Sequence, residues 1–258
     1  MKHHFVKTAN HSTLMAAVRF MDERGSLSSP LCLIHGDPGV GKTRNISQWG
    51  AESSAVLIKG HVGMNLDGLS WSISQQLGIK HRPNRTAEMN EQINVLKSMR
   101  TPIVFDEAQF GLSMRWQRTE AAGIEYLRQL GESADVFVLL VCHNSEVYRF
   151  SDSAHIRTRI AHRCELKNAS QDDTIKFVGE LCDVAIGKGV GEYVHQQTGG
   201  KYRLIENAIT SIERISKVQA KACIELADVE GMTLVVDHEQ GLIPKIAPKS
   251  NAGRWGKR

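Results

Sequence analysis

Short apolar segments recur along the first two thirds of the chain and alternate with segments in which apolar residues repeat every three or four positions. The short segments predict five strands, over residues 31–34, 55–58, 102–105, 136–141 and 163–166. The periodic segments predict helices, among them 43–51, 66–77 and 120–130. Strands that alternate with helices indicate an α/β fold, with a five-stranded parallel sheet covered by helices on both faces. In such a sheet ligands bind at the carboxyl ends of the strands.

The starts of two further helices can be predicted from polar residues that cap helices. Asn10 or Ser12 could cap a helix that runs to about Arg24. Thr86 is expected to cap another helix. The expected buried face of that helix is apolar and consists of Met89, Ile93 and Leu96.

Strand patterns become sparse after residue 170, where helices are predicted over residues 172–185, 191–197 and 202–220. We therefore expect three regions. Residues 1–168 form the α/β domain with an N-terminal helix, 169–238 form a small helical lid, and 239–258 form a basic tail.

Composition and charge narrow the class of protein. Apolar residues make up 41% and charged residues 23% of the chain, and no apolar run approaches the ~20 residues of a membrane span. The N-terminus lacks the apolar core of a signal peptide, so we expect a cytoplasmic protein without a membrane partner. The five scattered cysteines contain no C-x-x-C pair, which argues against a zinc ribbon or a disulfide framework. The net charge is +4, and residues 240–258 alone carry five cations and no acid, so this tail could bind nucleic-acid phosphates or serve only solubility.

The segment that carries the clearest chemistry follows the first predicted strand and matches G-x-x-x-x-G-K-[ST]. Its residues, with the arginine that follows, are Gly36, Asp37, Pro38, Gly39, Val40, Gly41, Lys42, Thr43 and Arg44. Glycines allow successive backbone N–H groups to surround phosphate oxygens, Lys42 can reach the β- and γ-phosphates, and the Thr43 hydroxyl can bind Mg²⁺. Strand, loop and helix occur in the required order, so we expect a nucleoside triphosphate, ATP, with Mg²⁺ as its metal.

The third predicted strand ends in two acids, Asp106 and Glu107. Asp106 would hold Mg²⁺ opposite Thr43, and Glu107 would act as the general base on the attacking water. The spacing from the phosphate loop supports this assignment. Glu107 argues against a simple kinase, in which the acceptor hydroxyl is the nucleophile, so the pair predicts an ATPase.

Polar residues at the end of the fourth strand and before the fifth could complete the site. Asn144 is the first choice to position the water and His143 the second; a polar strand end without a role is the alternative. An arginine just before the fifth strand can reach the nucleotide of a neighbouring subunit, and Arg159 is preferred to Arg157, with Arg163 also possible. Surface ion pairs are the alternative explanation for these arginines.

The last long helix is preceded by Gly200-x-x-Arg203. Arg203 could move from the helical lid onto bound nucleotide and so report whether ATP or ADP is present.

Taken together these motifs resemble those of AAA+ ATPases, over roughly residues 5–220. Within that superfamily the chain is most similar to transposition regulators of the phage Mu B protein, TnsC and TniB type. Three segments suggest this: Gly-Val-Gly-Lys-Thr-Arg44, Asp-Glu-Ala-Gln109 and His-Asn-Ser-Glu-Val-Tyr148. The resemblance implies ATP-dependent assembly into rings or filaments on duplex DNA and delivery of that DNA to a transposase. The Mu protein has an additional N-terminal DNA-binding domain, so here the AAA+ body would itself have to contact DNA.

Candidate DNA contacts lie in basic loops. The predicted set combines an arginine pair around a tryptophan with basic residues of other loops, and consists of Arg115, Trp116, Arg118, Lys59, Lys80, Arg82 and Arg85. An ordinary solvated loop explains each residue equally well on its own. Binding would be mainly to the DNA backbone and largely independent of sequence.

Three functions compete. The first is an ATP-gated DNA-binding assembly that serves a transposase, with hydrolysis driving disassembly. The second is a helicase- or clamp-loader-type ATPase that acts on a protein ring. The third is a signalling ATPase that holds ADP and needs no DNA. The basic tail and the Arg-Trp-Arg segment favour the first over the second.

Overall fold

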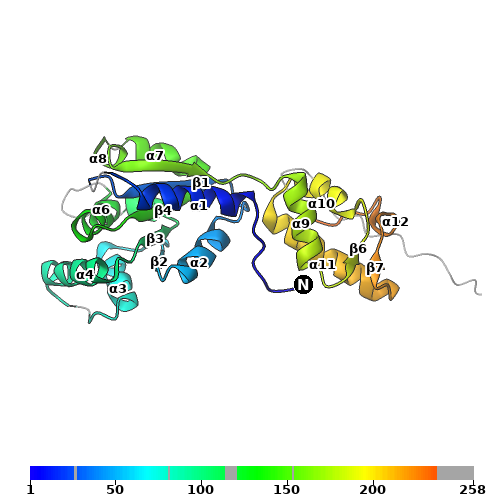
Figure 1. Cartoon of the computed structure of the whole chain (residues 1–258), viewed down its shortest axis with the longest axis horizontal. Coiled ribbons are helices and arrows are strands. Elements are labelled where there is room, and N and C mark those ends of the chain that lie inside the picture. The colour runs from blue at the N-terminus through cyan, green and yellow to red at the C-terminus, as the bar shows by residue number, and fades with distance from the viewer. Residues whose placement is uncertain (26–27, 81, 114–120, 153, 237–258) are drawn as a thin grey trace, which may run out of the picture. The chain divides into compact units, whose positions relative to one another are not determined.

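Two separately packed units make up the part of the chain that the computed structural model describes, which is residues 1–25, 28–80, 82–113, 121–152 and 154–236 (Figure 1). The α/β unit comprises residues 7–168, and the helical unit comprises residues 1–6 and 169–236. Each unit has an apolar core of its own.

The α/β unit alternates strands with helices. Its elements are, in chain order, α1 (Ala9–Asp22), β1 (Leu31–Gly36), α2 (Lys42–Glu52), β2 (Val56–Lys59), α3 (Leu66–Gln76), α4 (Arg85–Met99), β3 (Ile103–Asp106), α5 (Gln109–Leu112), α6 (Ala122–Ala134), β4 (Val138–His143), the 3₁₀ turn η1 (Asn144–Glu146), α7 (Val147–Asp152), α8 (Ala154–Arg157) and β5 (Ile160–Glu165).

The five strands form one parallel sheet in the order β2-β3-β4-β1-β5, which confirms the predicted sheet. Strand β1 lies between β4 and β5, so its ladder hydrogen bonds are satisfied on both edges. Alternate side chains of β1 point to opposite faces: Leu31 and Leu33 join one apolar cluster, and Cys32 and Ile34 join the other. Burial on both faces explains why the strand sequence is continuously apolar.

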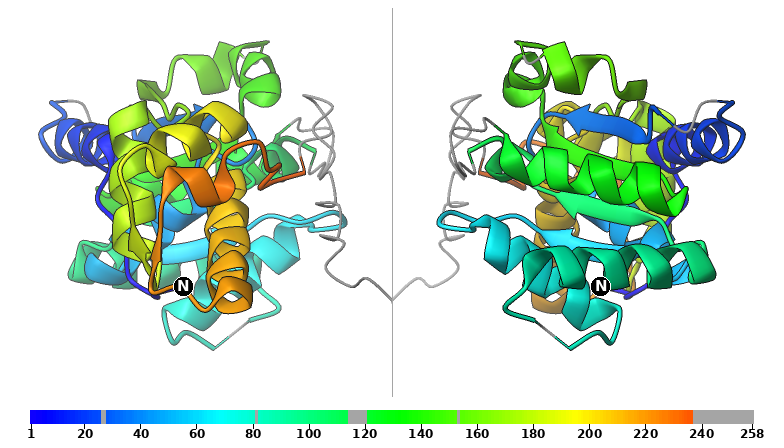
Figure 2. Two further views of the ribbon diagram at one scale, coloured as in Figure 1. Left: turned by 90° about the vertical axis from the view of Figure 1, so that its right-hand side faces the viewer. Right: turned by 90° about the vertical axis from the view of Figure 1, so that its left-hand side faces the viewer.

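Helices cover both faces of the sheet (Figure 2). One face packs against apolar residues of α3, α4 and α6, and the other packs against those of α1 and α2. Because all strands are parallel, the loops after β1, β3 and β4 meet at the carboxyl edge of the sheet.

Helix α1 begins before the predicted cap. Thr8 is the N-cap residue, whereas Asn10 lies inside the helix and is buried. The Asn10 amide donates to the carbonyl oxygens of Val40 (3.0 Å) and Lys167 (2.7 Å) and accepts from the Lys167 N–H (3.0 Å). The prediction of Asn10 or Ser12 as the cap is therefore wrong. Asn10 uses its hydrogen bonds to join the phosphate loop to the segment after β5.

Helix α4 also differs from its prediction. Its cap is Asn84, whose side chain accepts from the Ala87 N–H (3.1 Å), and Thr86 is exposed within the first turn. The buried residues of α4 recur every four positions and are Glu88, Gln92 and Leu96. The predicted Met89 and Ile93 are only half-buried, because polar partners on α3 and α6 receive the buried face.

The helical unit contains α9 (Gln171–Leu181), β6 (Ala185–Ile186), α10 (Val190–Thr198), α11 (Tyr202–Gln219), β7 (Cys223–Ile224) and α12 (Leu226–Val229). Strands β6 and β7 form a small parallel pair, and the three longer helices enclose the core. No described helix has the length and apolar composition that a membrane span requires.

The first six residues pack in the helical unit, although the predicted domain boundaries placed them with the α/β domain. The Lys2 N–H donates to the Leu181 carbonyl oxygen at 2.8 Å, and the Met1 ammonium pairs with Asp183 and Glu213. Figure 1 shows the N-terminus beside α9 and α11. A charged amino terminus thus anchors this segment to the C-terminal helices, which its sequence did not indicate.

Candidate nucleotide-binding site

The loop between β1 and α2 has the backbone shape that phosphate binding needs. Gly39 and Gly41 have φ of 87° and 81°, a left-handed conformation that glycine adopts without strain. At Gly36 a Cβ atom would lie 2.4 Å from the Leu166 carbonyl oxygen, so only glycine fits there. Gly41 is the N-cap of α2, and no described side chain caps this helix. The positive end of the helix dipole is therefore directed at the loop.

Lys42 lies inside this loop, with 8% of its surface exposed. Its ammonium donates to the carbonyl oxygens of Gly36 (2.6 Å) and Asp37 (3.0 Å) and lies 3.3 Å from Nδ1 of His143. Burial lowers the pKa of Lys42, while the nearby carboxylate of Glu107 acts in the opposite direction. The ammonium is thus held inside the loop by three nearby acceptors, at the place where the motif predicts phosphate oxygens.

A contact between Thr43 and Asp106 joins the phosphate loop to the acidic end of β3. The Thr43 hydroxyl donates to Oδ2 of Asp106 at 2.8 Å, and Asp106 is buried at the end of β3. A hydroxyl and a carboxylate at this distance are hard oxygen ligands of the kind Mg²⁺ prefers, with water and phosphate oxygens completing its shell. No cluster of three His, Cys, Asp or Glu ligands occurs among the described residues, so a site built by protein ligands alone is not seen there.

Glu107 is held in an unusual backbone conformation beside these residues. Its φ is 55°, which is rare for a residue other than glycine. Its Oε2 accepts from the Gln109 amide at 2.6 Å and lies 3.4 Å from Nε2 of His143. The Oε1 atom of Gln109 is buried without a partner in the described part of the chain. Gln109 is thus a contact of the predicted base, whereas sequence analysis named it only within the segment that resembles transposition regulators.

The two polar residues at the end of β4, His143 and Asn144, have different partners. His143 accepts from the Lys42 ammonium through Nδ1, which leaves its Nε2 proton facing Glu107. Asn144 instead donates to Oδ1 of Asp37 (2.8 Å) and accepts from Nδ1 of His35 (2.7 Å). His143, the second choice from sequence, therefore lies nearest to the predicted phosphate and base positions.

His35 was missed because it lies within an otherwise apolar strand. The amide oxygen of Asn144 can only accept, so His35 must carry its proton on Nδ1. The opposite amide orientation would turn the oxygen of Asn144 towards the Asp37 carboxylate. The chain His35–Asn144–Asp37 therefore fixes the first turn of the phosphate loop.

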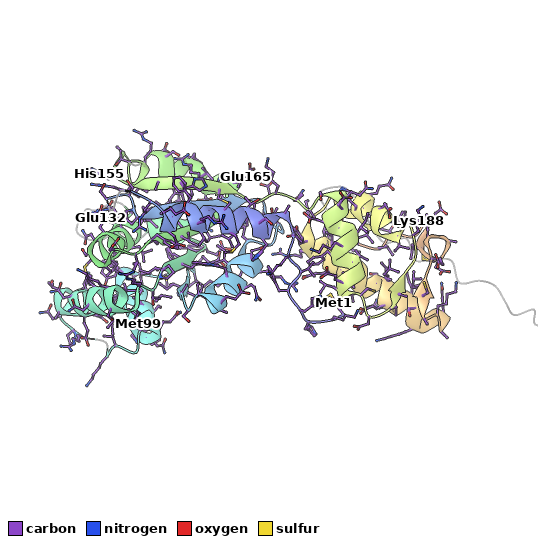
Figure 3. The ribbon with its side chains drawn as sticks, viewed as in Figure 1. Met1, Met99, Glu132, His155, Glu165 and Lys188 are labelled. Atoms are coloured by element: carbon purple, nitrogen blue, oxygen red, sulfur yellow. The ribbon has the colours of Figure 1, made fainter. Side chains whose placement is uncertain are left out.

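Arg157 and Arg159 lie at the other edge of the sheet, before β5 begins, whereas Arg163 lies within β5 and donates to the Ser151 hydroxyl at 3.1 Å. Arg159 donates to the Ser28 carbonyl oxygen (2.9 Å) and pairs with Glu132 (3.4 Å). Figure 3 labels Glu132 at the opposite end of the α/β unit from Glu165, which ends β5. Arg157 is exposed and donates to the Ser151 carbonyl oxygen (3.3 Å). Both side chains contact residues at this end of the sheet rather than the phosphate loop.

The other predicted contacts are on the surface or outside the described residues. Arg203 is exposed on the first turn of α11, in the helical unit, and Arg44 is half-buried on the first turn of α2. The exposed predicted DNA contacts are Lys59, Lys80 and Arg82, of which Arg82 pairs with Glu91 at 2.8 Å. Outside the described residues lie Arg115, Trp116 and Arg118, and also the C-terminal tail.

Comparisons with known proteins agree with the observed fold. Residues 27–150 match the family described as AAA domain. The structure is similar to the Aeropyrum pernix ORC2 protein in its ADPNP–ADP complexes, with a TM-score of 0.60, 14% identity, and coverage of 88% of this chain and 69% of that chain. It is also similar to Cdc6p of Pyrobaculum aerophilum, with a TM-score of 0.60, 14% identity, and coverage of 88% and 68%.

A third similar structure is the Thermotoga maritima RuvB Holliday junction branch migration motor. Its TM-score is 0.56 at 17% identity, with coverage of 87% of this chain and 68% of that chain. No curated protein matches the sequence. The match over residues 27–150, the β2-β3-β4-β1-β5 sheet and the helical region after it together show that the chain has the P-loop AAA+ fold.

Proposed function

We propose that the chain is an ATP-dependent DNA-binding ATPase that oligomerises on duplex DNA and delivers it to a transposase. The observation that carries the catalytic part is the 2.8 Å hydrogen bond between Thr43 and Asp106, because it places the phosphate loop and the acidic strand end at one site. The sequence resemblance to transposition regulators supports the remainder. The similar Aeropyrum pernix ORC1 protein was solved in complex with DNA.

The reaction is transfer of the γ-phosphoryl group from ATP to water, giving ADP and inorganic phosphate. Lys42 binds the β- and γ-phosphates, and the backbone N–H groups of the loop surround them. Thr43 and Asp106 would hold Mg²⁺, which supplies neutralisation of phosphate charge when bound. Glu107 takes the proton that the attacking water loses, and His143 keeps the carboxylate of Glu107 beside the ammonium of Lys42.

Hydrolysis would be linked to assembly through an arginine of the neighbouring subunit. Arg159 was the first choice from sequence, but its bonds to Ser28 and Glu132 tie it to its own subunit. Arg157 is exposed with one backbone contact, so these contacts favour Arg157. Supplied in trans, such a group neutralises charge in the transition state and is worth about 10³-fold or more in turnover.

The test is co-sedimentation of the Glu107→Gln protein with duplex DNA and ATP. Without the base, ATP stays intact, so the protein should pellet with DNA for far longer than wild type. Wild type should release DNA as ATP is consumed. A Glu107→Gln protein that hydrolyses ATP at the normal rate would show that another group is the base.

The alternative is a helicase- or clamp-loader-type ATPase that acts on a protein ring. Its fold would be the same, as the likeness to the RuvB branch migration motor illustrates. It predicts rings that form without DNA and turnover that depends on a protein client. The same co-sedimentation would then show no ATP-dependent transfer of wild type to the DNA pellet.

A further inference from the structure

The long helix of the helical unit presents one continuous polar face to solvent. Its buried side is apolar and packs into the core through residues such as Ile205, Ile209 and Ile212. Five exposed residues recur at spacings of three or four on the opposite side. They are named here the α11 stripe and are Arg203, Asn207, Thr210, Arg214 and Lys217.

The α11 stripe contains three cations and no acid. The acids of α11 lie beside the stripe and are Glu206 and Glu213. Glu213 is engaged elsewhere, since it pairs with the Met1 ammonium at 2.8 Å and accepts from the Asp183 N–H at 3.0 Å. Arg214 and Lys217 form no ion pair within 4 Å with any described residue. Both side chains are exposed; Lys217 also acts electrostatically on Asp183, whose main partner is the Met1 ammonium.

The connection to the preceding helix fixes how α11 is presented. Helices α10 and α11 are joined by three residues, Gly199-Gly200-Lys201. Gly199 and Gly200 have φ of 55° and 75°, and a Cβ on Gly200 would lie 2.2 Å from the Ala169 carbonyl oxygen. A short glycine-containing turn between two packed helices is the connection used in helix-turn-helix units, whose second helix contacts DNA.

The chemistry and length of the α11 stripe fit duplex DNA. From Arg203 to Lys217 the helix rises by about 21 Å, at ~1.5 Å per residue. This equals roughly six base pairs at ~3.4 Å each, and the major groove admits an α-helix. Arginine and lysine bind phosphates, and asparagine and arginine can also bond base edges. The five residues of the stripe are polar, and the exposed apolar side chain beside them on α11 is Val218, at the C-terminal end of the helix.

We propose that the α11 stripe is a duplex-DNA contact surface, separate from the basic loops predicted from the sequence. The inference rests on the proposed function in one respect, namely that the chain binds DNA. It adds a place where the helical unit itself holds the DNA backbone.

The test measures DNA affinity of the full chain as salt is varied. A fluorescein-labelled plain duplex is titrated with protein and a non-hydrolysable ATP analogue, from about 50 to about 200 mM salt. Arg214→Ala/Lys217→Ala should reduce the slope of log K against log salt by about 2, at ~0.9 per lost phosphate contact. Over this salt range the variant should then lose about tenfold less affinity than wild type. Arg203 is left unchanged because a nucleotide contact is predicted for it.

Two controls separate a DNA contact from other effects. Arg214→Lys/Lys217→Arg preserves both charges and should keep the wild-type slope. Arg19→Ala/Lys188→Ala removes the same charge from exposed positions outside the stripe and should also keep it. Figure 3 labels Lys188, and this residue lies beside α10 and α12.

Each outcome bears on one proposal or on both. Wild type that binds no duplex at any salt overturns both the proposed function and this inference. Wild type that binds while Arg214→Ala/Lys217→Ala keeps its slope overturns the inference alone. Loss of self-association with an unchanged slope would also overturn it, because the stripe would then contact a second copy of the chain.

Discussion

Replacement of Lys42 by methionine tests the phosphate-binding role most cleanly, because it removes the charge and keeps most of the side-chain volume. The Lys42 ammonium donates to the carbonyl oxygens of Gly36 and Asp37 and to Nδ1 of His143. In the apo protein Lys42→Met loses these bonds, but it also no longer buries a charged group. Burial of the cation is unfavourable, as the lowered pKa of Lys42 indicates. The melting temperature of the apo protein should therefore change little.

The nucleotide-bound state should lose far more. Two charge-assisted hydrogen bonds to phosphate are worth about 3 kcal/mol together, which weakens ATP binding by roughly 100-fold. At an ATP concentration about 100 times the wild-type Kd, ligand binding stabilises wild type by about 2.7 kcal/mol and Lys42→Met by about 0.4 kcal/mol. For a unit of this size, the melting shift should be about 5–10 °C in wild type and about 1–2 °C in the variant.

Differential scanning fluorimetry with and without ATP and Mg²⁺ measures both quantities. Lys188→Met, at an exposed lysine of the helical unit, is the matched control and should keep the full wild-type shift. A full nucleotide-induced shift in Lys42→Met would refute the assignment of Lys42 to the phosphates. A large fall in the apo melting temperature would instead show that the ammonium is needed to build the loop.

Two further predictions concern the arginines and the buried thiols. Arg157→Ala should lower DNA-stimulated turnover by about 10³-fold without changing monomer ATP affinity. Arg159→Ala should instead lower the melting temperature, because Arg159 binds Glu132. Turnover and melting assays on both variants check these two expectations. Burial raises the pKa of Cys142 to about 12 and that of Cys164 to about 11, above the ~8.5 of an unfolded thiol. The folded state then holds protons that the unfolded state releases, so stability is complete below about pH 8.5 and falls as pH rises towards about 11. Urea unfolding at several pH values measures this, and Cys142→Ala/Cys164→Ala should flatten the decline; an unchanged decline would assign it to other groups.

The sheet and the Lys42–Thr43–Asp106 site could be predicted because each depends on local pattern. An apolar run predicts a strand buried on both faces, and the parallel arrangement brings its carboxyl end to the same edge as the next strand end. The spacing of glycines before Lys42 predicts the loop, since the required backbone conformation belongs to glycine.

Residues whose role depends on distant partners could not be predicted in this way. Asn10 is of a residue type that often caps helices, but its hydrogen-bond partners Val40 and Lys167 are far along the chain. Periodicity likewise assigned Met89 rather than Gln92 to the buried face of α4, because nothing in that segment shows that polar groups of other helices would receive Gln92.

The Gln92 network illustrates the point in physical terms. Gln92 is fully buried, donates to Ser70 and Ser74, and accepts from the Tyr126 hydroxyl at 2.7 Å. A buried amide is stable only when its bonds are satisfied, and here the partners come from α3 and α6. Only the assembled fold shows that they do.

The most direct measurement is negative-stain electron microscopy of the wild-type protein with a non-hydrolysable ATP analogue, with and without plain duplex DNA. We expect rings or filaments around DNA that are absent when ADP replaces the analogue. Particles that form equally well without DNA, or a protein that stays monomeric with both ligands, would contradict ATP-dependent assembly on DNA.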